Sequence, residues 1–100
     1  MVVSLRGELI RVLSTIEEKA NELKLDGYNP DVVLMGSEAY MFVKELVAYE
    51  FGSDEEVTEL SGLPLRLVDE LRGDAVVADS KTLGYGEGER RFKVVDVNVR

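Results

Sequence analysis

The feature that most constrains the fold is a regular spacing of apolar residues near the start of the chain. Between residues 5 and 25 they recur every three or four positions, which predicts an amphipathic helix whose apolar face needs a covering layer. We expect Ser4 to cap the start of this helix and Gly27 to end it in a left-handed conformation. The residues expected to face the core are Leu5, Leu9, Val12, Leu13, Ile16, Ala20 and Leu23.

The segment that follows predicts a strand joined directly to a second helix. The residues "YNP" break the first helix, and "DVVLM" at residues 31–35 has the unbroken apolar run of a strand covered on both faces. Ser37 is expected to cap a helix that ends at Gly52. We interpret Ser37 as a cap and not as a nucleophile, because the chain has no histidine that could activate it.

The second helix is apolar on two sides. Such a helix is either buried within its own domain or shared with a neighbouring subunit, and both alternatives stay open. We predict that its second stripe contacts another subunit. The first stripe consists of Ala39, Phe42, Val43 and Leu46, and the second of Tyr40, Val47 and Phe51.

Three later segments alternate between apolar and polar residues. "LPLRL" at residues 63–67 predicts a strand with one polar side, and Pro64 favours a strand start or a sheet edge. After a turn at Arg72-Gly73, "DAVVAD" predicts another strand. In "RRFKVVDVNVR" at residues 90–100 the alternation changes phase, and a bulge near Val94-Val95 accounts for the change. The edge strand could pair with a second subunit through Val95, Val97 and Val99.

These elements predict an α+β fold in which two main helices pack on a small mixed or antiparallel sheet. One hundred residues are enough for one hydrophobic core. We therefore expect a single domain, residues 1–100, with an N-terminal helix within residues 1–28 and a strand–helix–strands core in residues 29–100.

Composition excludes several classes of site. The chain has no cysteine and no histidine, so it can form no disulfide, thiolate nucleophile, zinc finger or imidazole catalyst. Its net charge of −8 argues against nucleic acid as a partner. Without a long apolar run or a leader-like start, we expect a cytoplasmic protein with no membrane contact. Plentiful Glu, Lys and Arg without Trp or Gln are typical of a thermophilic source, or of ordinary drift in a short chain.

Acidic residues form two groups. One group lies in "SDEEVTE" and predicts a solvated loop, with ion binding, a pore lining or a basic protein partner as the alternatives. Asp69, Glu70, Asp74 and Asp79 bracket a strand and could hold a cation, although a surface role is favoured. The acidic loop residues are Asp54, Glu55, Glu56 and Glu59.

Four tyrosines could each supply a phenol group. Nothing beside them in the sequence indicates a shifted pKa. They are Tyr28, Tyr40, Tyr49 and Tyr85.

The segment "DSKTLGYG" at residues 79–86 contains a Lys-Thr pair like that of a phosphate-binding loop. Such a loop needs glycines before the lysine and a helix after it, whereas here the glycines follow. We interpret the segment as a corner. The sequence therefore predicts no catalytic residue, no cofactor and no metal site, and we expect a protein that is not an enzyme.

Two passages carry a resemblance to a known family. "NPDVVLMGSEAYMFVKEL" and "LSGLPLRLVDELRGDAVVADSKTLGYG" resemble the axial domain of tailed-phage major capsid proteins and encapsulins. The whole chain is similar to the truncated archaeal encapsulins called family four. The resemblance implies that residues 29–31 start the first strand, residues 62–64 start the next and residues 79–84 form a turn.

The resemblance also implies a function. It implies self-assembly through axial-domain contacts around a symmetry axis, into rings or a shell-like compartment that sequesters a metabolic enzyme. The partners would be other copies of the chain and a cargo enzyme. The alternative interpretation is a small acidic module that binds a cation or a basic protein.

Overall fold

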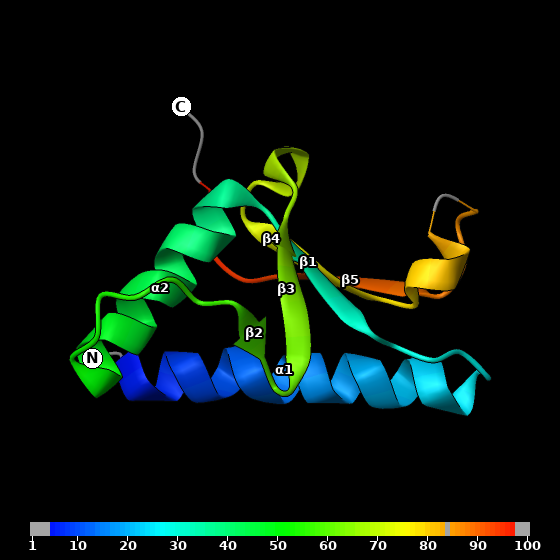
Figure 1. The fold of residues 1–100 in the computed structure, drawn as a ribbon, viewed down its shortest axis with the longest axis horizontal. Helices are drawn as coiled ribbons and strands as arrows, with labels where there is room; N and C mark the ends of the chain where they lie inside the picture. The colour runs from blue at the N-terminus through cyan, green and yellow to red at the C-terminus, as the bar shows by residue number, and fades with distance from the viewer. Residues whose placement is uncertain (1–4, 84, 98–100) are drawn as a thin grey trace.

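The computed structural model describes residues 5–83 and 85–97, and it contains two helices and a five-stranded sheet (Figure 1). The α+β fold predicted from the sequence is confirmed. In chain order the elements are α1 (Leu5–Leu25), β1 (Val32–Met35), α2 (Ser37–Phe51), β2 (Glu59–Leu60), β3 (Leu63–Leu67), η1 (Asp69–Leu71), β4 (Asp74–Ala78), η2 (Ser80–Thr82) and β5 (Glu89–Lys93), where η marks a single turn of 3₁₀ helix.

The sheet is mixed, with the strand order β2-β3-β1-β4-β5. β1 runs parallel to β3 and antiparallel to β4, and the β2–β3 and β4–β5 pairs are antiparallel. β2 was not predicted, because two residues are too short to show an alternation. Pro64 is the second residue of β3, so the predicted strand start is confirmed.

Both helices pack on the same face of the sheet. One core cluster joins buried residues of α1 and α2 to Val33 and Met35 of β1 and to Ala75 and Val77 of β4. A smaller cluster lies on the opposite face, where Leu71 and Leu83 cover part of β1 and β4. The face without helices is therefore covered mainly by the two 3₁₀ turns and the chain beside them.

The helix α1 follows its predicted pattern closely. Its buried residues belong to the predicted face, Leu13 packs against the core, and Gly27 has the expected left-handed φ of 91°. Leu5 is an exception, because it is 41% exposed at the first turn. The predicted cap Ser4 lies outside the described residues. The buried residues of α1 are Leu9, Val12, Ile16, Ala20 and Leu23.

The start of α2 differs from the prediction. Ser37 is not the N-cap: the helix is preceded by Gly36 with extended backbone, and the Ser37 hydroxyl donates to the Glu38 carboxylate instead. The amide of Ala39 donates to the carbonyl oxygen of Arg72 at 2.9 Å. A backbone carbonyl of another segment therefore accepts the hydrogen bond that a capping side chain usually accepts. At the other end, Gly52 is left-handed and its amide donates to the carbonyl of Ala48, as predicted.

Gly36 is required by a close approach of two backbones. A Cβ at this position would overlap the backbone of Arg72. The amide of Gly36 also donates to the carbonyl of Asp74 at 3.0 Å. The predicted turn at Arg72-Gly73 is present, and Arg72 adopts a positive φ of 53° in it. The β1–α2 connection is thus fixed against the start of β4.

The C-terminal strand is shorter than predicted. β5 ends at Lys93, so Val95 and Val97 do not lie in a strand, and Val99 lies outside the described residues. The predicted bulge is seen in the hydrogen bonds, because the amides of Val94 and Val95 both donate to the carbonyl of Gly73. At this bulge the chain stops pairing with β4 and turns toward α2.

Candidate functional site

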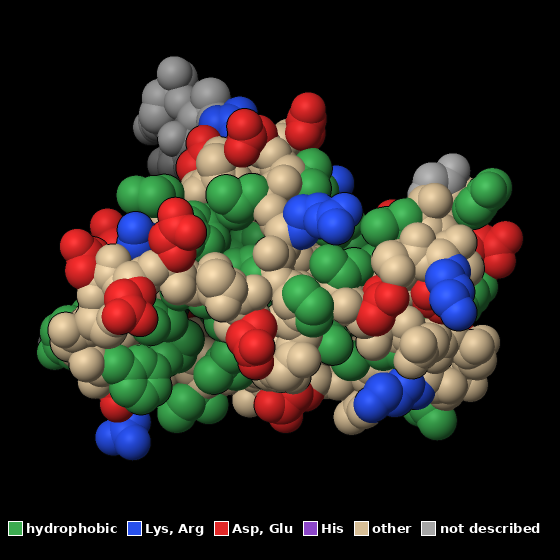
Figure 2. Space-filling model, in the orientation of Figure 1, with side chains coloured by type: hydrophobic (Ala, Val, Ile, Leu, Met, Phe, Trp, Pro, Cys, Tyr) green, Lys and Arg blue, Asp and Glu red, His purple; other side chains and the backbone are tan. Residues whose placement is uncertain are grey.

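An apolar groove lies where the end of α2 meets α1. Its volume is about 360 Å³, and Phe51 beside it is 70% exposed. Hydrophobic side chains gather in this region, at the lower left of the space-filling view (Figure 2). We call it the α2 groove. Its apolar lining consists of Leu9 and Leu13 from α1, Val47 and Phe51 from α2, and Val57 and Leu60 from the loop and β2.

The predicted acidic loop forms one wall of this groove. Glu55, Glu56 and Glu59 line it, and their side chains are exposed. Within residues 5–83 and 85–97, none of these three carboxylates, nor that of Asp54, has a cation within ion-pair distance. The structure therefore brings together two features that the sequence presented separately, the second stripe of α2 and the acidic loop.

Tyr40 holds the acidic loop against α2. Its hydroxyl accepts a hydrogen bond from the amide of Val57 at 3.2 Å, and its ring packs against the core. Tyr40 is therefore half-buried, whereas Val47 and Phe51 of the same stripe line the groove. Its contribution to the groove is to position the wall that carries the glutamates.

A second surface with exposed apolar side chains lies at the other side of α2, and its lining also includes Ser37, Glu38 and Asp96. Val95 and Val97 are half-buried there and border a shallow hollow of about 390 Å³ with Met41, which is 57% exposed. We call Met41, Val95 and Val97 the C-terminal surface. Sequence reasoning missed Met41, since it belongs to neither predicted stripe of α2. No local sequence signal marks Met41, because only the fold brings the C-terminal segment to this side of α2.

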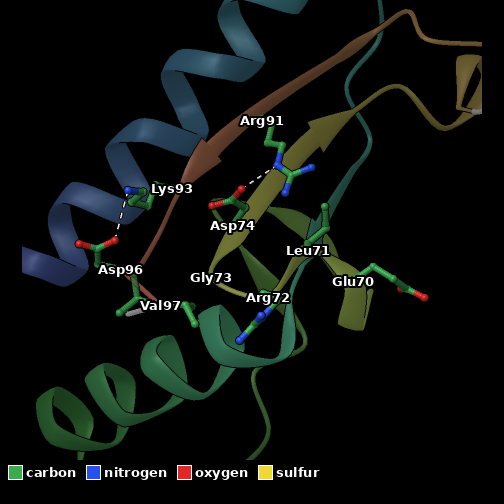
Figure 3. A pocket seen from close by; sticks show the side chains of 10 residues that line it. Glu70, Leu71, Arg72, Gly73, Asp74, Arg91, Lys93, Asp96 and Val97 are labelled. Carbon is green, nitrogen blue, oxygen red and sulfur yellow. Dashed lines mark hydrogen bonds and ion pairs between the residues drawn. The ribbon is translucent and has the colours of Figure 1, made fainter. Parts of the chain in front are cut away.

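Charged side chains surround a pocket of about 270 Å³ next to this surface (Figure 3). Arg91 contacts Asp74 at 2.7 Å, and Lys93 contacts Asp96 at 3.3 Å. The side chains of Arg91 and Lys93 are 58% and 67% exposed, so these ion pairs are solvent-screened and contribute little to stability. The lining carries three basic side chains, Arg72, Arg91 and Lys93, and three acidic ones, Glu70, Asp74 and Asp96, so its charges are balanced.

The corner that resembled a phosphate loop is a network of hydrogen bonds. Asp79 is only 6% exposed, so the predicted surface role is wrong for this residue. Its carboxylate accepts hydrogen bonds from the amides of Asn29 and Lys81, both at 3.0 Å, and these bonds hold its pKa below the usual range. Asp31 accepts from the amide and hydroxyl of Ser80. The corner ties the start of β1 to η2.

Tyr28 is one of the four tyrosines for which the sequence showed no sign of a shifted pKa. Its hydroxyl donates to the carboxylate of Glu87 at 2.9 Å, and this hydrogen bond is the main cause of a raised pKa. The expectation that no tyrosine pKa is shifted is therefore wrong for Tyr28. The signal was absent locally, since Glu87 is far along the chain and only the fold brings it near.

Two kinds of site were searched for among the described residues. No group of three or more Asp, Glu, His or Cys side chains is placed to hold a metal ion in residues 5–83 and 85–97. Over the same ranges, neither helix combines the length and the apolar character that a membrane crossing requires. What the described structure does present is two surfaces with exposed apolar side chains on different sides of α2.

Comparison with known families identifies the family to which the chain belongs. Residues 6–96 match the family described as "putative type 4B encapsulin shell protein". The chain belongs to this encapsulin family. A search of curated proteins finds no significant match. The family match begins in α1 and ends after β5, so it includes the α2 groove and most of the C-terminal surface.

Proposed function

We propose that this encapsulin-family chain is a structural subunit that assembles with copies of itself into rings or a shell-like compartment. The proposal is carried by the exposed apolar side chains of α2, among them Phe51 and Met41, in a family of shell proteins. Exposed apolar patches next to charged rims are typical of contact sites between proteins. The building unit would be one axial-like domain of residues 1–100, with no catalytic role.

The proposed contact residues lie on the two surfaces. Val47 and Phe51 belong to the α2 groove, and Tyr40 supports the wall of that groove. Val95 and Val97 belong to the C-terminal surface, and Val99 follows them in the sequence. Burial of these side chains between subunits would remove apolar area from water, at about 25 cal/mol for each Å².

The compartment would enclose a metabolic enzyme. A net charge of −8 disfavours packaged nucleic acid, whose phosphates would be repelled, and is compatible with a protein cargo. Copurification tests this part: expression in the source cells with an affinity tag should yield one enzyme in a fixed ratio to the subunit. A subunit that assembles but copurifies with no enzyme would contradict the cargo and leave the assembly standing.

Negative-stain electron microscopy tests the assembly. Particles of uniform diameter, either rings or closed shells, are the expected result at the concentrations used for structural work. Fields without regular particles at every concentration and salt condition would argue against a shell-forming role. The method also separates rings from shells.

The acidic loop favours a second candidate function, a binding module for a cation or a basic protein. Its four carboxylates lack an ion-pair partner among the described residues. A specific ligand raises the melting temperature by mass action. We expect no rise with calcium or magnesium, because the described acidic side chains form no three-membered cluster. A rise that saturates with cation concentration would favour this alternative.

A further inference from the structure

We propose that the free edge of β5 pairs antiparallel with the same edge of a second copy, so that two sheets join across a two-fold axis. This inference rests on the proposed self-assembly and names the strand through which two subunits meet. β5, the orange strand in Figure 1, is the last in the sheet order β2-β3-β1-β4-β5. Its outer side therefore has no neighbouring strand.

Hydrogen bonds at both ends of β5 show which of its backbone groups face outward. The amide of Val94 donates to the carbonyl of Gly73. At the other end, the amide of Asp79 donates to the carbonyl of Gly88. Bonded and non-bonded pairs alternate along an antiparallel ladder, so the even-numbered residues of β5 bond to β4 and the odd-numbered ones face away. The outward-facing residues are Glu89, Arg91 and Lys93.

The outward backbone groups are open to a further strand. Within residues 5–83 and 85–97, the one hydrogen bond found to them is from the guanidinium of Arg90 to the carbonyl of Glu89, at 3.0 Å. All three outward-facing residues are exposed. A strand alongside would give each free amide an acceptor and each free carbonyl a donor.

The opposite edge of the sheet is protected in ways that β5 is not. β2 is only two residues long, and Pro64 beside it has no amide to donate. The amide of Leu65 is already bonded to the carbonyl of Thr58 at 2.9 Å. β5 has five residues, no proline and an unbroken register with β4. Of the two edges, β5 is the one open to pairing.

The sequence of β5 is complementary to itself in the antiparallel direction. With Arg91 on the two-fold axis, Glu89 of each copy lies opposite Lys93 of the other. Arg90 lies opposite Phe92, a pair in which a guanidinium can stack on a ring. All five residues pair in this register. The occupant of the edge is thus a second copy of this chain.

Charges on this edge are balanced within each copy. Exposed lysines and arginines usually keep an edge strand apart from others. Here each cation of β5 already contacts a carboxylate of its own copy, so two edges meet without the repulsion of unpaired like charges. The contacts are Arg91 with Asp74, Lys93 with Asp96, and Arg90 with Glu22 and Asp26.

A two-fold contact closes on itself, so pairing through β5 alone gives a dimer. Rings or shells would then be built from dimers through a second surface. The α2 groove takes none of its lining from β5, so both contacts can form at once.

Single cysteines can map this contact, because the chain has none of its own. Residues opposite each other in a hydrogen-bonded pair have Cα atoms about 5.5 Å apart, a separation that a disulfide spans. Under mild oxidation, Arg91→Cys should form a disulfide-linked dimer as the main product. A mixture of Glu89→Cys and Lys93→Cys should link the two variants to each other. Non-reducing gel electrophoresis and mass spectrometry identify the products.

Matched controls come from the same strand. In Glu89→Cys alone or Lys93→Cys alone, the two cysteines would lie about 14 Å apart across the two-fold axis, so each variant should stay mostly unlinked. Both positions are exposed, as Arg91 is, so random collisions would link all three variants alike. Equal linking of the three would overturn the inference.

Proline at the centre of the edge tests the backbone hydrogen bonds. Arg91→Pro removes an amide that faces away from β4, whereas Arg91→Ala removes only the side chain. We expect Arg91→Pro to associate roughly tenfold more weakly than Arg91→Ala in sedimentation velocity. Circular dichroism checks that both variants are folded. Equal association of the two folded variants would contradict pairing through this edge.

The outcomes separate this inference from the proposed function. If the unaltered chain assembles but Arg91→Cys forms no linked dimer, the edge of β5 is not the contact and the inference is overturned, while self-assembly stands. If the unaltered chain has a mass of 11.1 kDa under every condition, the proposed function itself fails and the inference fails with it.

Discussion

The two ends of α2 have opposite surroundings. At its start, Gly36 lies against the backbone of Arg72 with no room for a Cβ, and Ala39 is fully buried. At its end, Phe51 is largely exposed and Gly52 has open space around it. One helix therefore combines a start that fits a single backbone arrangement with an end whose apolar surface is uncovered. The comparison separates residues that specify the fold from residues available for contacts.

The largest effect is expected at the start of α2. Gly36→Ala forces a methyl group into the Arg72 backbone, which cannot yield as a flexible side chain can. We expect a loss of about 3 kcal/mol or more in the free energy of unfolding, at the upper end of overpacking effects. Urea unfolding followed by circular dichroism measures it. If Gly36→Ala lowers the free energy of unfolding by less than Gly52→Ala does, the start of α2 is not the more tightly packed end.

Gly52→Ala is the matched substitution at the end of α2. Its new methyl group meets open space, but Gly52 has a φ of 66° that disfavours other residues. We expect a loss of about 1 kcal/mol, from backbone strain alone. Equal losses for Gly36→Ala and Gly52→Ala in the same urea experiment would show that packing does not distinguish the two ends.

A smaller loss of stability, which depends on pH, is expected at Asp79. This residue follows β4 and accepts a hydrogen bond from Asn29, which precedes β1. The pKa of Asp79 is lowered from 3.8 by hydrogen bonds from Asn29 and Lys81. The unfolded chain therefore binds the proton at a higher pH than the folded chain. The stabilisation is complete well above pH 3.8 and is lost as the pH falls through the folded-state pKa.

Asp79→Asn removes this titration. We expect the variant to be less stable than the unaltered chain at neutral pH, and the difference to shrink as the pH is lowered below about 4. Melting temperatures between pH 2.5 and 7 measure the difference. A difference that stays constant over the whole range would contradict the assigned cause.

The smallest effect on the fold is expected at the exposed end of α2. Phe51→Ser should change the free energy of unfolding by no more than about 0.5 kcal/mol, because the side chain is mostly in solvent. The same substitution should weaken self-association clearly. Unfolding at low protein concentration and sedimentation at high concentration separate the two effects. A strongly destabilised monomer would place Phe51 in the core of the fold.

Local sequence patterns were sufficient for most elements. Apolar spacing predicted α1 and α2, and short alternating or apolar runs predicted β1, β3 and β4, because these signals act within a few residues. The acidic loop and the second stripe of α2 were also visible, but not that they line one groove. That proximity depends on how the loop folds back, which Tyr40 fixes through Val57.

Two of the errors share one physical origin. Ser37 was predicted as a cap because serine is a good capping residue, yet the carbonyl of Arg72 takes that role from a distant segment. Asp79 was predicted on the surface because carboxylates usually are exposed, yet the backbone amides of Asn29 and Lys81 satisfy it in a buried site. In both cases a long-range backbone contact overrides a local preference.

The measurement that tests the central claim most directly is the molar mass of the unaltered chain in solution. Light scattering behind a sizing column, over a range of protein and salt concentrations, gives this mass without a shape assumption. The account predicts a mass that is a multiple of 11.1 kDa and grows toward a defined assembly as concentration rises. A mass of 11.1 kDa under every condition would contradict it.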